Sequence, residues 1–96
     1  MREEHWMTTG EFCKYYQVEI SFVNALEEFG LIDISRIEEK NYIEKERLAD
    51  LEKFIHMHYD LNINMEGIDA IHHLLERMKS LRSEVESLKN RLSAYE

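Results

Sequence analysis

The sequence predicts a mainly α-helical chain, in which a helix-turn-helix and a small two-stranded wing precede a long C-terminal coiled-coil helix. Three observations predict this arrangement. The 96 residues include no Pro and only three Gly, so few positions interrupt a helix. Apolar residues recur at helical spacing in several segments and alternate in one short stretch. The last third of the chain carries a strict heptad repeat.

The first two predicted helices are short and close together. Thr8 stands three residues before Glu11, and this capping-box spacing predicts a helix that ends near Gln17. Ser21 is a residue type that favours N-caps, so it predicts the start of a second helix, which Gly30 ends in a left-handed conformation. Two short helices joined by about four residues form a helix-turn-helix unit.

A wing and two further helices are predicted after that unit. Apolar residues alternate imperfectly along residues 31–37, and a polar turn leads from there to a returning strand. A third helix is expected over about 44–59, and Asn64 is placed to cap a fourth. We therefore predict a winged helix-turn-helix domain at residues 1–63 and a C-terminal dimerisation helix at residues 64–96.

The C-terminal helix carries the most regular pattern in the sequence. Its apolar residues alternate between spacings of three and four, which predicts a coiled coil rather than a helix lying on the domain. The preceding domain is too small to cover such a stripe, so we predict a homodimer formed through this helix. The expected interface residues are Ile71, Leu74, Met78, Leu81, Val85, Leu88 and Leu92.

The charge of the chain argues against nucleic acid as a partner. There are 20 acidic residues and 12 basic ones, which gives a net charge of −8. Nucleic-acid affinity depends on clustered Lys and Arg that neutralise phosphates, and the sequence has no such cluster. We therefore expect no specific DNA binding and an attraction to a basic protein.

No residue pattern predicts catalysis, a metal site or a cofactor. His56 and His58 point about 200° apart on a helix and cannot share an ion. The single cysteine, Cys13, excludes an internal disulfide, indicates a reducing compartment, and is interpreted as a small buried hydrophobic residue. The longest uncharged stretch, Ile20–Leu26, is far shorter than the roughly 20 residues of a membrane span, and no secretory signal is present. We expect a cytoplasmic protein that is not an enzyme.

The order of the predicted elements resembles the MerR family of winged helix-turn-helix proteins. In that family the second helix is followed by Gly-Leu-Leu or Gly-Leu-Ile, and here Gly-Leu-Ile occupies residues 30–32. The Arg and two Tyr with which DNA-binding members meet the DNA backbone correspond here to Asn24, Ala25 and Leu26. The resemblance therefore implies the fold without its DNA contacts.

The chain also resembles an offshoot of that family that does not bind DNA, the chaperone modulator CbpM family, over nearly its whole length. The likeness is carried by Glu11-Phe12-Cys13, by Leu61 followed by Gly67-Ile68, and by the Leu-rich heptad tail. CbpM-like proteins bind the J-domain of a DnaJ-type co-chaperone, CbpA, and restrain its work with DnaK. The resemblance implies that function. The alternatives are a MerR-like transcriptional regulator and a coiled-coil adaptor for another basic protein.

The resemblance also directs attention to one surface. J-domains carry a basic face through which they engage DnaK, and an acidic partner could cover that face. The acidic residues of this chain gather where DNA-binding relatives carry their contacts, on the second helix and the wing. The expected partner-binding residues are Glu19, Glu27, Glu28, Asp33, Glu38 and Glu39.

Overall fold

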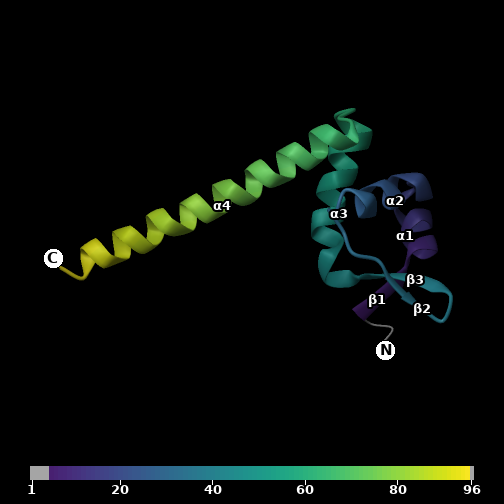
Figure 1. Cartoon of the computed structure of the whole chain (residues 1–96), viewed down its shortest axis with the longest axis horizontal. Helices are drawn as coiled ribbons and strands as arrows, with labels where there is room; N and C mark the ends of the chain where they lie inside the picture. The colour runs from purple at the N-terminus through teal and green to yellow at the C-terminus, as the bar shows by residue number, and fades with distance from the viewer. Residues whose placement is uncertain (1–4, 96) are drawn as a thin grey trace.

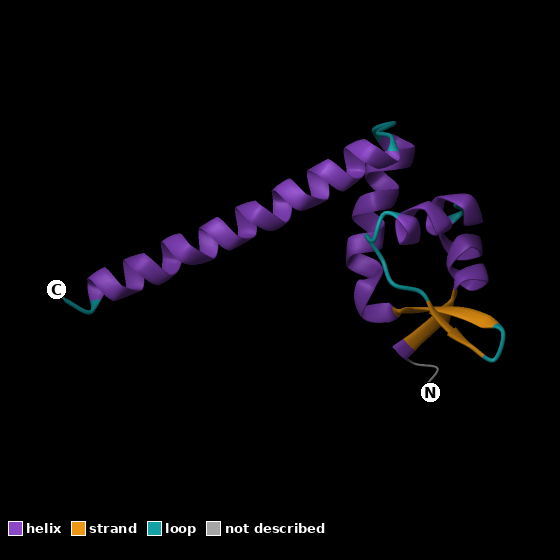
Figure 2. Cartoon of the chain, viewed as in Figure 1, coloured by secondary structure: helices purple, strands orange, loops and turns teal. Residues whose placement is uncertain are grey.

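A computed structural model describes residues 5–95 and shows a small head at one end of a long, straight helix (Figures 1 and 2). The predicted order of helix-turn-helix, wing, helix and long C-terminal helix is confirmed. The molecule measures 58 × 34 × 20 Å. The elements are β1 (Trp6–Thr8), α1 (Thr9–Tyr16), α2 (Ile20–Glu28), β2 (Ser35–Ile37), β3 (Lys40–Glu44), η2 (Lys45–Arg47), α3 (Leu48–Ile55), η3 (His56–Asp60) and α4 (Met65–Ser93).

Local hydrogen bonds fix the start of α1 and the end of α2 as the sequence predicts. The Thr8 hydroxyl accepts a hydrogen bond from the Glu11 backbone N–H at 3.1 Å. Gly30 adopts φ = 74°, and the Leu31 N–H that follows it donates to the Leu26 carbonyl at 2.9 Å. A Schellman motif contains two hydrogen bonds, and this is the one that spans more residues. The motif requires a left-handed residue at the position of Gly30.

The predicted start of α2 is wrong. The helix begins at Ile20 with Glu19 as its N-cap residue, so Ser21 lies in the first turn. The Ser21 hydroxyl donates to the Glu19 carboxylate at 3.3 Å instead of capping the backbone. The Glu19 backbone N–H donates to the Tyr59 hydroxyl at 3.1 Å. A contact with a distant segment therefore holds this helix end, where the sequence analysis expected a local cap.

The sheet has three antiparallel strands in the order β1-β3-β2. Strands β2 and β3 are the predicted wing, with Ile37 opposite Lys40 across a two-residue loop. The sequence analysis missed β1, which pairs Met7 with Ile43, because three residues are too few to show an alternating pattern. Ile43 is fully buried, so the wing is anchored to the core through its central strand.

The predicted third helix is interrupted in the structure. Residues 45–47 form a 3₁₀ turn, α3 follows, and the last turn widens into the π-helical segment η3. Leu51 and Phe54 carry the predicted apolar face and are buried. π-helical turns are rare and are found often at functional sites.

The core fills the space among α1, α2, α3 and the sheet, and the base of α4 completes it. Asn64 caps α4 as predicted, accepting from the Gly67 N–H at 2.8 Å. A Cβ at Gly67 would lie 2.7 Å from Ile63 Cγ2, so only glycine fits this approach of the two segments. The buried apolar residues are Phe12, Val18, Phe22, Val23, Leu26, Ile32, Ile43, Leu51, Phe54 and Ile68.

The loop of the β2–β3 hairpin is made of two glutamates in an unfavourable backbone conformation. Glu38 and Glu39 have φ = 50° and φ = 66°. A two-residue hairpin loop with both φ values positive is a type I′ turn, which strongly favours Asn-Gly. A non-glycine residue in this region costs on the order of 1–3 kcal/mol. The two carboxylates at the tip of the wing are therefore present although the backbone conformation of their residues lowers the stability of the fold.

Replacing this pair by Glu38→Asn with Glu39→Gly should raise the free energy of unfolding by about 1 kcal/mol, since both new residues adopt positive φ readily. Urea denaturation measures the change. The variant Glu38→Ala with Glu39→Ala removes the same charges but keeps the backbone penalty, so it should stay within about 0.5 kcal/mol of the parent. Equal stabilisation of both variants would assign the cost to charge repulsion and contradict the prediction.

Candidate partner-binding surfaces

The six predicted partner-binding acids lie at both ends of α2 and on the wing. Glu27 and Glu28 end α2, and Glu38 and Glu39 form the hairpin tip. Glu19 lies at the other end of α2, nine positions from Glu28, or about 13 Å along a helix. The structure therefore brings the wing acids near the end of α2 and sets Glu19 beside η3.

Glu27 differs from the other acids because a cation from the wing pairs with it. Arg36 Nη2 lies 3.1 Å from Glu27 Oε1, and Nη1 lies 3.3 Å from Oε2. Two parallel hydrogen bonds of this kind are stronger and more directional than a single one. Glu28 and Asp33, which follows α2 in the loop to β2, are exposed. A substitution at Glu27 would disturb the wing as well as the surface charge, so Glu28 is the better position for a test.

Two segments without any cation meet at the start of α2. Residues 15–35 and residues 54–76 each contain four acids and no Lys or Arg. Phe22 of α2 stacks on His58 of η3 with ring centroids 4.9 Å apart, and the Tyr59 ring meets Phe22 edge-on at 5.3 Å. The sequence analysis identified only the first of these segments as acidic. The second becomes part of the same surface through contacts between residues about 40 positions apart.

A shallow groove of about 380 Å³ lies at this junction of α2 and η3. We call it the α2–η3 groove. Sequence reasoning missed it, because it is formed by the packing of η3 on α2. The residues that line it are Glu19, Ser21, Phe22, Ala25, His58, Tyr59 and Met65.

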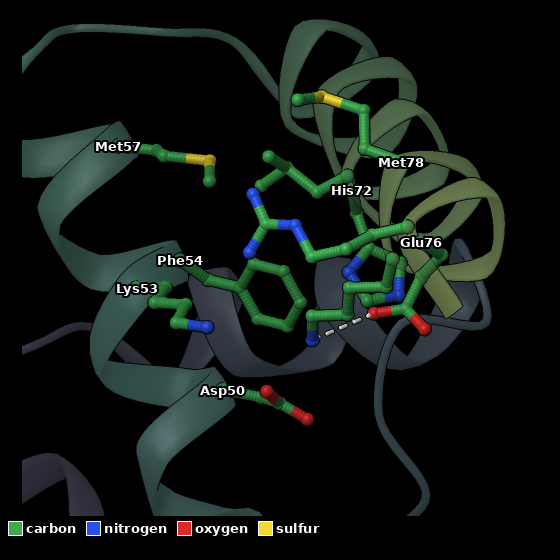
Figure 3. A pocket seen from close by; sticks show the side chains of 10 residues that line it. Asp50, Lys53, Phe54, Met57, His72, Glu76 and Met78 are labelled. Atoms are coloured by element: carbon green, nitrogen blue, oxygen red, sulfur yellow. Dashed lines mark hydrogen bonds and ion pairs between the residues drawn. The ribbon is translucent and has the colours of Figure 1, made fainter. Parts of the chain in front are cut away.

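A second hollow, of about 190 Å³, lies in the angle between α3 and α4 (Figure 3). The Phe54 ring lies at its centre, 5.4 Å from the His72 ring of α4. Met78 lines this hollow and also belongs to the predicted heptad stripe, so the hollow is continuous with that stripe. Charges of both signs surround it, including the Glu76–Lys79 pair at 3.3 Å, which gives no preference for an anion or a cation.

The heptad stripe of α4 is exposed in the single chain. Ile71 is partly buried, and the other six predicted interface residues range from 48% exposed at Leu81 to 66% at Leu92. Every residue from 73 to 95 is exposed. The head therefore does not cover the stripe, as the sequence analysis expected. A row of exposed large apolar side chains is typical of interaction sites.

The isolated reactive side chains have ordinary structural roles. Burial raises the pKa of the half-buried Cys13 thiol, which makes its reactive thiolate scarcer. The Tyr16 hydroxyl donates to Glu52 Oε1 at 2.8 Å, and burial together with this bond raises the pKa of Tyr16 to about 12.

Within residues 5–95, no three His, Cys, Asp or Glu side chains are grouped as metal ligands would be. No helix in the described part of the chain is long and apolar enough to span a bilayer.

Comparison with protein families agrees with this architecture. The family model described as MerR HTH family regulatory protein matches residues 7–90, which include the whole helix-turn-helix, the wing and most of α4. The chain belongs to the MerR family. Comparison with curated proteins and with solved structures finds no match.

The helix-turn-helix of this MerR protein is poor in cations. Helix α2 contains Glu27 and Glu28 and no base, and α1 contains Lys14 alone. On the wing, Arg36 is committed to Glu27, which leaves Lys40 as a further cation of the hairpin. The family fold is thus combined with a surface whose charge opposes phosphate.

Proposed function

We propose that this MerR-family protein acts on a protein partner, as a dimeric modulator of the CbpM type. In this proposal it binds the J-domain of a DnaJ-like, CbpA-type co-chaperone and restrains the activity of that co-chaperone with DnaK. One observation carries the proposal: the helix-turn-helix has no Lys or Arg between Lys14 and Arg36. Specific and non-specific DNA binding both depend on cations that neutralise phosphates.

The acids of this surface suit a basic protein partner. Glu28, Asp33, Glu38 and Glu39 are exposed on α2, the adjoining loop and the wing. Charges of opposite sign on two proteins speed and orient their encounter, and they do this more than they add affinity. A J-domain presents a basic face, and covering that face would compete with DnaK. The resemblance to the CbpM family selects this partner among basic proteins.

We further propose that a second copy of the chain covers the heptad stripe of α4. Helices with such a stripe bury it against a partner helix by knobs-into-holes packing. Met78 belongs to the stripe and lines the hollow between α3 and α4, so a partner helix lying along the stripe would also reach that hollow. This arrangement would leave both acidic heads of a dimer accessible.

A MerR-like transcriptional regulator is the second candidate. The family match covers the complete helix-turn-helix and wing, which are the DNA-binding parts in other members. This candidate requires that Lys14, Lys40 and the C-terminal cations supply enough positive charge.

The protein should not bind duplex DNA specifically at about 150 mM salt, because its acidic α2 repels phosphates. Fluorescence anisotropy with the promoter region of its own gene measures this, with a shuffled duplex of equal length as the control. Specific DNA-binding proteins typically reach dissociation constants of about 10⁻⁸ M or below. Sub-micromolar binding that distinguishes the two duplexes would favour the transcriptional regulator.

Either Leu81→Asp or Leu88→Asp should convert the proposed dimer to a monomer. An unpaired charge buried in an apolar seam costs several kcal/mol, which a short coiled coil cannot absorb. Light scattering at tens of micromolar protein measures the mass. Ser83→Asp places the same charge on the opposite face of α4 and should leave the dimer intact. A monomeric parent protein would overturn the dimer proposal and leave the stripe for another partner.

The double reversal Glu28→Lys with Glu39→Lys should slow association with a purified J-domain severalfold at low salt and flatten its salt dependence. Both residues are exposed, and neither pairs with Arg36. Surface plasmon resonance at two ionic strengths gives both quantities. The control, Glu46→Lys with Glu86→Lys, changes the net charge equally on exposed positions of η2 and α4. No binding of the parent protein to the J-domain would contradict the proposed function itself.

A further inference from the structure

We propose that the α2–η3 groove is the seat for a basic amphipathic helix of a protein partner. The inference deepens the proposed function and rests on it where the partner is taken to be a J-domain. The wing acids would then steer the encounter, and the groove would hold the partner. Shape, charge and the exposed face of α2 each support this assignment.

The floor of the groove is apolar and held in place by ring stacking. Phe22 is almost fully buried, and its ring lies nearly parallel to the His58 ring, with 22° between their planes. His58 Nδ1 lies 3.1 Å from the Ile63 carbonyl oxygen, which fixes this ring from the other side. Tyr59 remains 43% exposed, and Met65 also lines the groove. An exposed aromatic ring beside an adaptable methionine suits the apolar anchor of a binding partner.

The carboxylate residue that lines the groove is Glu19, and two further acids stand next to lining residues in the chain. Glu19 lines it directly, and Asp60 and Glu66 follow Tyr59 and Met65 in the chain. Asp60 Oδ2 pairs with His56 Nδ1 at 2.7 Å. The two segments that form the groove, residues 15–35 and 54–76, contain no Lys or Arg. A cationic segment can therefore reach the groove without meeting a like charge from either segment, whereas a nucleic acid would be repelled.

The shape of α2 favours a helix as the occupant. Ser21 and Ala25 both line the groove and are four positions apart, so they lie on one face of α2 with small side chains. Glu28 continues the same face seven positions after Ser21. A partner helix can approach this small-residue face closely, with Glu19 and Glu28 at its two ends. Cations about two and a half turns apart on the partner would match the two acids, in the helix-in-groove mode of recognition.

The first test maps the binding site on the isotopically labelled full chain by nuclear magnetic resonance. Two probes are added separately: a purified J-domain, and a helical peptide with Lys on one face and Leu on the other. A peptide of the same composition whose Leu residues do not share a face is the control for non-specific attraction to an acidic protein. We expect the J-domain and the amphipathic peptide to shift amides of residues 19–25 and 57–65, and the scrambled peptide to leave them unchanged.

The outcomes separate the groove from the proposed function. Shifts from the J-domain confined to residues 36–42 of the wing would overturn the groove and leave the proposed function standing. If the J-domain does not bind but the amphipathic peptide shifts the groove, the proposed function fails and the groove stands. If neither probe shifts residues 19–25 and 57–65, the groove inference is overturned.

The second test fills the groove. Ala25→Trp should weaken binding of the probe that binds the parent protein by at least about tenfold, because the indole occupies the space of the partner's anchor. Circular dichroism shows whether Ala25→Trp folds. If it does not, Ser21→Trp, at an exposed position of the same face, replaces it in the binding measurement. Asn24→Trp is the matched control in the next exposed position of α2, outside the groove lining. Unchanged affinity in folded Ala25→Trp and Ser21→Trp proteins would overturn the inference.

Discussion

The contact between α2 and η3 is the interaction on which the rest of the structure depends. Phe22 stacks on His58, and the Glu19 backbone N–H donates to Tyr59, so both ends of this contact involve the first turn of α2. It fixes where α2 begins, which no local cap does. It also joins the helix-turn-helix to the segment that leads into α4. These rings hold the base of the long helix on the head together with Ile68, which is buried in the core, and Phe54, whose ring meets His72.

The distribution of charge follows from this contact. Each of the two cation-free segments contains four acids, and the packing of η3 on α2 sets Glu19 of the first segment beside the second. Arg36 then offsets one of these acids at the far end of α2, where the wing begins. Two carboxylates are kept at the hairpin tip in spite of their positive φ values. The head of this MerR protein thus carries exposed acids on α2, the adjoining loop and the wing.

Much of the architecture could be predicted from the sequence, because it depends on local patterns. The heptad stripe, the Thr8 and Asn64 caps and the left-handed Gly30 are each determined by residues within a turn or two of one another. The features that escaped prediction depend on long-range contacts. Ser21 is a favourable N-cap residue, but the Tyr59 hydroxyl binds the chain two residues earlier. Strand β1 exists because β3 offers it an edge.

The same division applies to the candidate site. The acids of α2 and the wing could be identified by counting charges, whereas the pairing of Glu27 with Arg36 and the groove beneath Glu19 required the folded chain. Sequence reasoning finds which residues are available, and the packing of η3 on α2 decides which of them share a surface.

The separation of the head from the heptad stripe has a consequence for binding strength. The stripe lies on the part of α4 that projects away from the head, so pairing of two α4 helices would leave the groove and the wing of each chain free (Figure 1). Each pair between exposed charges contributes only about 0.2–1 kcal/mol, so charge pairs alone would hold a basic partner on one acidic head weakly. Two heads on one dimer raise the effective concentration of the second site once the first is occupied, provided that the partner is itself multivalent. The long helix would in that case convert a modest charge complementarity into a strong and selective association. This is a physical reason for a small acidic head to carry a helix that extends far beyond the base that completes its core.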